Sequence, residues 1–145
     1  MTRRFPGLEQ TIYKDDELAD GFYLVRVQRI SYRYDARRPH FWLRLAVLEP
    51  KQFSGRTIEG RLYCTNRALW KLSWFLRDFG YDQERLSAAE VDERAVVDLR
   101  GIVHIAHFIE NGRRQVQLAG FASAAQWPEL SSLLPPGSDI KREAA

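Results

Sequence analysis

Hydrophobic and polar residues alternate with a period of two in three segments of the first half of the chain. These segments are residues 22–30, 40–48 and 58–64, and they are rich in β-branched and aromatic side chains. Such alternation indicates strands with one apolar and one polar face. We expect residues 31–39, which are basic and aromatic and end in a proline, to form a loop. Residues 49–56, which contain a proline and a glycine, are expected to form a turn.

A helix is predicted over residues 67–79, where apolar side chains recur at three- and four-residue spacing. Thr65 and Asn66 are candidate N-caps for this helix, and Gly80 is a candidate C-terminal stop. A second, shorter helix is expected over residues 87–94. These helical segments separate the first three strands from the rest of the chain.

Two further strands, residues 101–109 and 113–121, flank Asn111-Gly112, the dipeptide best suited to the positive φ angles of a type I′ turn. The turn sets the register of the hairpin, with Glu110 opposite Arg113, His107 opposite Val116, Ile105 opposite Leu118 and Val103 opposite Gly120. One face of the hairpin is then mostly apolar. The other face carries His104, Ala106, Phe108, Gln115 and Gln117.

Three strands, a helix and a two-stranded hairpin follow one another in the order of the OB-fold. This all-β fold is a five-stranded Greek-key barrel, here with its helix between strands three and four. A β-sandwich needs about seven strands, more than the chain supplies. We place the domain at residues 21–127, between an N-terminal arm (1–20) and a C-terminal tail (128–145). OB-folds bind oligonucleotides on strands two and three and through the loops joining strands one to two and four to five.

A length of 145 residues with 45% hydrophobic side chains suits one domain with one core. The single cysteine, Cys64, cannot form an intramolecular disulfide, which favours a cytoplasmic location. No apolar run approaches the roughly 18–20 residues that cross a bilayer, and residues 1–6 lack the apolar stretch of a secretory signal. We therefore expect no membrane partner.

Positive charge is concentrated in residues 21–77, which hold twelve Arg or Lys and three acidic residues, although the net charge of the chain is +3. The same region is rich in aromatic side chains. Cations interleaved with rings suit a polyanion that also offers bases for stacking. The alternative is that these arginines are ordinary solvated surface residues.

If the apolar strand faces fill the barrel, the opposite faces present rings beside cations. The candidate nucleic-acid-binding residues are Arg26, Gln28, Trp42, Arg44, Arg61 and Tyr63 on these faces, Tyr32, Arg33, Tyr34, Arg37 and Arg38 in the first loop, and Arg113 and Arg114 in the second hairpin. Stacking on such rings is worth about 1–3 kcal/mol per base. The alternative is that Trp42 and Tyr63 cover the barrel while the arginines lie over them or pair across strands.

Trp70 and Trp74 lie four residues apart on the predicted helix, off its main apolar stripe and near several basic residues. They form a second apolar patch, for which two interpretations are open. Either the N-terminal arm or the segment around Trp127 covers the patch, or the patch is a subunit interface or an additional nucleic-acid surface.

Catalytic and metal-binding patterns are weak. His104 and His107 point to opposite faces of a strand and form no zinc site with the single cysteine. The glycines form neither a phosphate-binding loop nor a nucleophile elbow. The acidic residues of 82–93 suit a solvated linker better than a metal-dependent nuclease, for which Glu90, Asp92 and Glu93 are the candidate ligands. We therefore expect no enzyme activity, no metal and no cofactor.

Turn glycines and core apolar residues form a series along the chain: Gly21–Tyr23, Phe41–Leu45, Val47–Glu49, Phe53–Arg56 and Ala68–Leu72, followed by Phe75, Leu76 and Gly80. Over roughly residues 21–121, this series resembles a family of small phage and mobile-element proteins. The resemblance implies an OB-fold related to single-stranded DNA-binding proteins.

From the sequence we hypothesise that the protein binds single-stranded DNA with low sequence specificity during replication or recombination of a phage or mobile element. RNA is an alternative ligand. A homo-oligomer and replication or recombination proteins are further candidate partners. The alternative function is an OB-fold that serves as a protein-interaction or assembly module without nucleic-acid binding.

Overall fold

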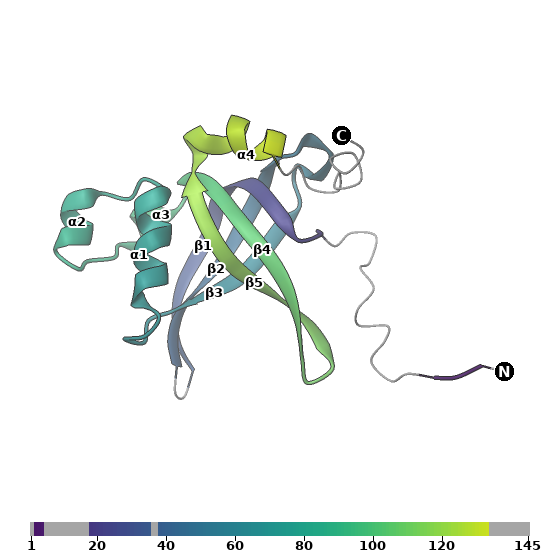
Figure 1. Ribbon diagram of the computed structural model, residues 1–145. Helices are drawn as coiled ribbons and strands as arrows, with labels where there is room; N and C mark the ends of the chain where they lie inside the picture. Colours follow the sequence, from purple (N-terminus) through teal and green to yellow (C-terminus); the bar gives the residue numbers. More distant parts are fainter. Residues whose placement is uncertain (1, 5–17, 36–37, 134–145) are drawn as a thin grey trace.

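The computed structural model describes residues 2–4, 18–35 and 38–133, which form a mostly β structure with short helices (Figure 1). The strands are β1 (Gly21–Asp35), β2 (Arg38–Glu49), β3 (Thr57–Tyr63), β4 (Arg100–Glu110) and β5 (Arg113–Ser123). The helices are α1 (Leu69–Asp78), α2 (Gln83–Ser87), α3 (Glu93–Val96) and α4 (Trp127–Leu133), with the 3-10 turns η2 (Lys51–Phe53) and η3 (Ala124–Gln126). The predicted order of strands and helical region is confirmed.

Neighbouring strands of the sheet are antiparallel, in the order β3-β2-β1-β4-β5. The sheet curls until its two edge strands approach each other. A Cβ atom on Gly60 of β3 would lie 2.6 Å from Cγ of Leu118 on β5, so the missing side chain lets Leu118 pack directly against β3. The result is a barrel-like sheet with a seam between β3 and β5. The ends of the β1–β2 and β4–β5 hairpins lie at the same end of the molecule (Figure 1).

Strand β1 continues through most of the segment predicted to be a loop. Residues 31–35 pair with residues 38–42 of β2, so the loop prediction is wrong for residues 31–35 and 38–39. Residues 36–37 of that prediction lie outside the described residues. Pairing with β2 satisfies the backbone hydrogen bonds of this segment, and the side chains of residues 32–34 are exposed. The first hairpin is therefore a long two-stranded arm.

A register shift between Val27 and Arg29 reverses the alternation of β1. Val27 and Ile30 are both buried, and Arg29 and Arg33 consequently share the outer face. A bulge adds one residue to one strand without requiring a particular residue type, so the alternation of hydrophobic and polar residues did not reveal it. The shift brings Arg29 beside the predicted binding face.

The second hairpin has the predicted turn, with φ angles of 53° at Asn111 and 77° at Gly112. Its register is confirmed near the turn, where Glu110 pairs with Arg113, His107 with Val116 and Ile105 with Leu118. The predicted pairing of Val103 with Gly120 is wrong. A register shift between His104 and Ile105 places Val103 opposite Phe121 instead.

Helix α1 begins two residues later than predicted and uses neither predicted N-cap side chain. Ala68 is the N-cap residue, and the backbone carbonyl of Thr65 accepts a hydrogen bond from the Leu69 N–H. The predicted stop at Gly80 is confirmed, because this residue follows the helix with φ of 84°, a conformation that glycine adopts without strain.

The predicted helix over residues 87–94 is wrong. Two shorter helices, α2 and α3, lie before and after the middle of that segment. Asp82 caps α2 by accepting a hydrogen bond from the Glu84 N–H, and Asp92 caps α3 in the same way from the Arg94 N–H. Aspartate caps as well as serine does, so the capping pattern by itself did not fix which acidic residue starts each helix.

The core lies inside the curled sheet and under α1. Its strand residues include Tyr23, Val25, Val27, Leu43, Leu45, Leu62, Ile105 and Leu118, all of which belong to the predicted apolar faces. Phe75 of α1 is fully buried, with its ring centroid 4.5 Å from that of Phe79 and 5.3 Å from that of Phe121 on β5. This aromatic cluster fixes α1 against β5.

The predicted N-terminal arm and C-terminal tail fall largely outside the described residues, which omit 5–17 and 134–145. Leu18, near the end of the predicted arm, is buried in the core. Helix α4 crosses the predicted domain boundary at residue 127. Within the described part of the chain, none of the helices has the length and apolar character needed to cross a membrane.

Candidate functional site

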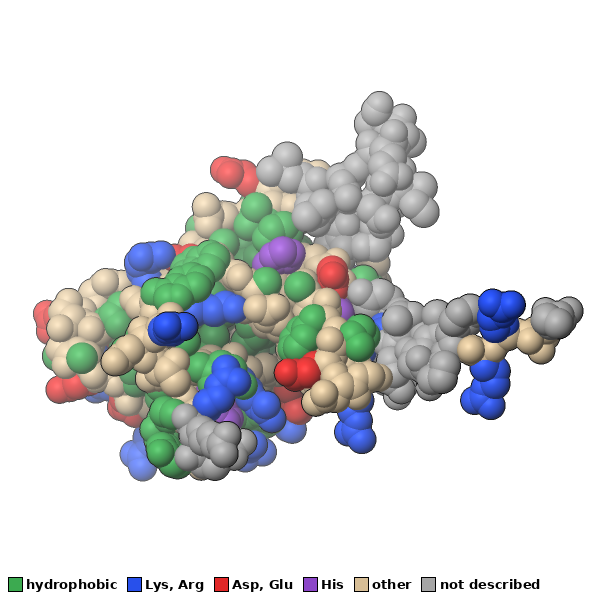
Figure 2. All heavy atoms as spheres, turned by 60° about the horizontal axis from the view of Figure 1, so that its bottom comes forward, with side chains coloured by type: hydrophobic (Ala, Val, Ile, Leu, Met, Phe, Trp, Pro, Cys, Tyr) green, Lys and Arg blue, Asp and Glu red, His purple; other side chains and the backbone are tan. Residues whose placement is uncertain are grey.

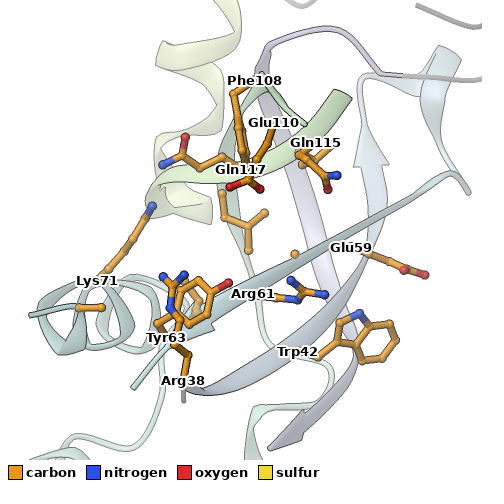
Figure 3. A pocket seen from close by; sticks show the side chains of 15 residues that line it. Arg38, Trp42, Glu59, Arg61, Tyr63, Lys71, Phe108, Glu110, Gln115 and Gln117 are labelled. Atoms are coloured by element: carbon orange, nitrogen blue, oxygen red, sulfur yellow. The ribbon is translucent and has the colours of Figure 1, made fainter. Parts of the chain in front are cut away.

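A groove with a volume of about 590 Å³ lies along the seam between β3 and β5. It is lined by Arg38, Trp42, Glu59, Gly60, Arg61, Leu62, Tyr63, Ala68, Lys71, Phe108, Glu110, Gln115, Val116, Gln117 and Leu118. Figure 3 shows Lys71 near one end of the groove and Trp42 and Glu59 toward the other, with Tyr63 and Arg61 between them. The groove is therefore an elongated site rather than an enclosed cavity.

Trp42 lies on the outer face of β2, half-buried, between Ser31 of β1 and Arg61 of β3 in the register of the sheet. Three guanidinium groups lie over its ring. Their central carbons are 4.6 Å (Arg33), 5.2 Å (Arg44) and 5.8 Å (Arg29) from the ring centroid. Cation–π contacts of this kind hold positive charge close to an aromatic face.

Tyr63, at the end of β3, provides a second ring with a cation over it. The guanidinium carbon of Arg38 is 4.0 Å from the centroid of the Tyr63 ring. His40, which pairs with Tyr63 from β2, has its ring centroid 5.5 Å from that of Tyr63. Arg38 and Tyr63 both line the groove. Trp42 and Tyr63 thus form two ring-and-guanidinium pairs on the β2–β3 surface.

Lys71 of α1 lines the end of the groove near Tyr63. Partial burial lowers the pKa of its ammonium group, because desolvation disfavours the charged form. Lys71 is one of the basic residues near the predicted tryptophan pair, and it was not among the predicted binding residues. The signal that could have identified Lys71 as a groove residue was its position on the predicted helix, on the face next to the sheet.

The wall opposite β3 comes from the β4–β5 hairpin. Phe108, Glu110, Gln115 and Gln117 face the groove from this side (Figure 3). Three of these four residues were assigned to the non-core face of the hairpin by the alternation, but were not proposed as contacts. Glutamine amides both donate and accept hydrogen bonds, so this wall can pair with polar edges of different kinds.

Positive charge dominates the β2–β3 side of the groove. Glu59 is paired with Arg44, whose Nε donates a hydrogen bond of 3.0 Å to the carboxylate, so its charge is offset locally. Figure 2, which turns the hairpin ends forward, shows Lys and Arg side chains gathered around the end of the β1–β2 hairpin. An anionic ligand would meet this positive surface first.

Several predicted contact residues lie away from the groove lining. Arg26 is ion-paired with Asp98 at 2.6 Å, and Gln28 is exposed at the register shift of β1. Tyr32 and Tyr34, 49% and 70% exposed, alternate with Arg33, and Tyr32 packs edge-on against Phe41, a residue of the inner face. The reversal of alternation in β1 put these two tyrosines on the face opposite Trp42.

Two of the remaining predicted contacts, Arg113 and Arg114, lie at the end of the β4–β5 hairpin. Arg113 is exposed and sits across from Glu110 on the groove side of the second hairpin. Arg114 pairs with Ile109, on the alternate face. Arg37 lies outside the described residues.

Trp74 and Trp70 differ in their surroundings. Trp74 is half-buried against β5, where a Cβ atom on Gly120 would lie 3.0 Å from its ring. Trp70 stacks on Trp74 and remains 61% exposed. One tryptophan therefore packs on the sheet, and the other presents its ring to solvent.

Among the described residues, no three His, Cys, Asp or Glu side chains gather into a metal-binding group. Burial raises the pKa of the Cys64 thiol more than its hydrogen bond with the Phe41 backbone lowers it, which disfavours the nucleophilic thiolate. A hydrogen bond from Arg85 lowers the pKa of Asp92, which caps α3. Asp92 thus has a structural partner and role.

No protein-family model matches the chain, and no curated protein matches it. The function is therefore argued from the geometry of the groove.

Proposed function

We propose that this protein is an OB-fold that binds single-stranded DNA with low sequence specificity in the groove between β3 and β5. The strand connectivity supports the OB-fold, because β1 pairs with both β2 and β4, α1 follows β3, and the two edge strands approach each other. OB-folds use the β2–β3 surface and the β1–β2 and β4–β5 connections for oligonucleotides. The groove described above lies at that place.

The observation that carries the proposal is the pair of cation-flanked rings, Trp42 and Tyr63, beside a groove that also contains Arg61 and Lys71. An unpaired strand exposes phosphates and base faces within one nucleotide of each other. Guanidinium and ammonium groups neutralise the phosphates, and rings stack on the bases. In a duplex the base faces are stacked on one another, so the single strand is the better ligand.

Low specificity follows from the same chemistry, because every base has a face that can stack. The side-chain amides of Gln115 and Gln117 can hydrogen-bond with either donor or acceptor groups on the base edges. The resemblance to phage and mobile-element proteins supports a role in DNA replication or recombination in the cytoplasm. RNA offers the same phosphates and base faces and is compared directly in the binding experiment.

Salt dependence tests the proposal. If Arg38, Arg61 and Lys71 each neutralise one phosphate, the logarithm of the association constant should fall with the logarithm of salt concentration with a slope of about −2 or steeper. Fluorescence anisotropy of labelled oligo(dT), oligo(U) and a duplex of equal length provides the measurement. Equal affinity for the duplex, or a slope near zero, would contradict the proposal.

A second prediction concerns pH. Because the pKa of Lys71 is lowered, its charge is lost at a lower pH than that of an ordinary lysine, and affinity should fall as the pH rises through that pKa. We expect a loss of up to about tenfold, equivalent to about 1.4 kcal/mol, once alkaline pH has deprotonated the Lys71 ammonium group. Oligo(dC) is the suitable probe, because cytosine does not ionise in this range.

The matched control is Lys71→Arg, which keeps the positive charge throughout this pH range. All other ionisable groups are present in both proteins, so the difference between the two pH profiles belongs to residue 71. Identical profiles for the wild type and Lys71→Arg would show that Lys71 does not contact the phosphates.

A further inference from the structure

Among the described residues, Trp70 is the most exposed tryptophan, with 61% of its surface accessible to solvent. It lies in the first turn of α1, next to Leu69, which is 43% exposed. Adjacent exposed apolar side chains form a patch of the kind that can mark a contact surface. The groove proposed above does not include Trp70 in its lining.

Trp70 is held on a rigid base. Its ring centroid is 6.0 Å from that of Trp74, and the two ring planes are 22° apart. Trp74 is fixed by a 2.8 Å hydrogen bond from its Nε1 to Asp78 Oδ2, by edge-on packing against Phe121 and by its contact with Gly120. One face of Trp70 is therefore occupied by Trp74, and little side-chain entropy is lost when a ligand ring stacks on the exposed side.

The platform formed by Trp70 and Trp74 adjoins the groove. Lys71, the next residue along α1, lines the groove near Tyr63, and Ala68 of the same segment lines it as well. Exposed Arg67 lies in the turn that precedes α1, and Arg67 and Lys71 both lie close to Trp70 along the chain. A single strand that leaves the groove past Lys71 would thus meet a third ring, Trp70, with cations nearby in the chain.

We propose that Trp70 is an additional base-stacking site outside the groove. It stacks on a nucleotide of a single strand that extends beyond the groove at the Lys71 end. This inference rests on the proposed function. The charge of the surroundings favours a polyanion over a second copy of the chain. A symmetric contact through Trp70 would bring Arg67 and Lys71 of one protomer toward the same residues of its partner, and like charges there oppose association.

The test compares oligo(dT) ligands of increasing length on the wild type and on Trp70→Ala. Short ligands that fill the groove should bind the two proteins equally. Longer ligands should gain affinity on the wild type, and Trp70→Ala should lack at least about fivefold of that gain. Leu69→Ala is the matched control, because it removes an exposed apolar side chain from the same helical turn without removing a ring.

Two further variants keep the test informative. Trp70→Phe should retain part of the gain with longer ligands, whereas Trp70→Leu, which fills space without a π-face, should behave like Trp70→Ala. Circular dichroism melting curves establish that each variant is folded, and sedimentation establishes its oligomeric state.

The outcomes separate the two proposals. If affinity increases equally with ligand length on the wild type and on Trp70→Ala, the proposed stacking site at Trp70 is overturned and groove binding remains intact. A wild-type dimer that becomes a monomer on Trp70→Ala, with unchanged DNA binding, would assign the surface to a second copy and overturn the inference. Failure of the wild type to bind any single strand would overturn the proposed function itself.

Discussion

Trp42→Ala is expected to weaken binding of single-stranded DNA by about 1–3 kcal/mol, or roughly 5- to 150-fold. The substitution removes the stacking face and also releases Arg33 and Arg44, which lie over the ring at 4.6 Å and 5.2 Å. Both arginines keep their charge, so the salt dependence should change little while affinity falls. Anisotropy titrations of oligo(dT) at several salt concentrations measure both quantities.

Two variants serve as controls for Trp42→Ala. Trp42→Phe keeps an aromatic face and should recover a large part of the affinity. Tyr34→Ala removes a 70% exposed ring from the same hairpin, on the face opposite Trp42, and should have a smaller effect. If Tyr34→Ala reduces affinity more than Trp42→Ala, the strand binds the other face of the β1–β2 hairpin.

Phe75→Ala is expected to lower the free energy of unfolding by about 3–5 kcal/mol. Phe75 is fully buried where α1 meets β5, in ring contact with Phe79 and Phe121. Alanine leaves a cavity that two neighbouring rings cannot fill without leaving their own contacts. Because small domains have a total stability of roughly 5–15 kcal/mol, a loss of this size should be evident in urea denaturation.

Phe75→Leu is the control for the stability prediction, since it keeps most of the apolar volume and should cost roughly 1–1.5 kcal/mol. Its DNA binding should match that of the wild type, because Phe75 does not line the groove. Equal unfolding free energies for Phe75→Ala and the wild type would mean that α1 is not anchored through this cluster.

The sequence predicted the candidate site only in part. It singled out Trp42, Arg61 and Tyr63 because strict alternation in β2 and β3 separates the two faces of each strand. It missed Arg29 because a bulge is not visible in the pattern of residue types. It missed Gln115 and Gln117 because polar residues on a hairpin face carry no signal for what lies across from them.

Charge density was an unreliable guide to position. Arg26 belongs to the basic segment and to the predicted face, yet it pairs with Asp98, a residue 72 positions away in the chain. Lys71 was not among the predicted contacts, yet α1 brings it to the end of the groove. A partner distant in sequence decides whether a cation is already neutralised or free to meet a ligand.

The sequence by itself determined the order of the five strands, the turn at Asn111-Gly112, the helix after β3 and the apolar strand faces that fill the core. These depend on local preference and on periodicity, which one segment expresses without reference to another. Only the tertiary structure decided that β3 and β5 meet over Gly60, which tyrosines share the face of Trp42, and that Trp70 stacks on Trp74 with its other side open. Those features depend on bulges and on contacts between distant segments, whose energies are set when the sheet curls and α1 packs against it.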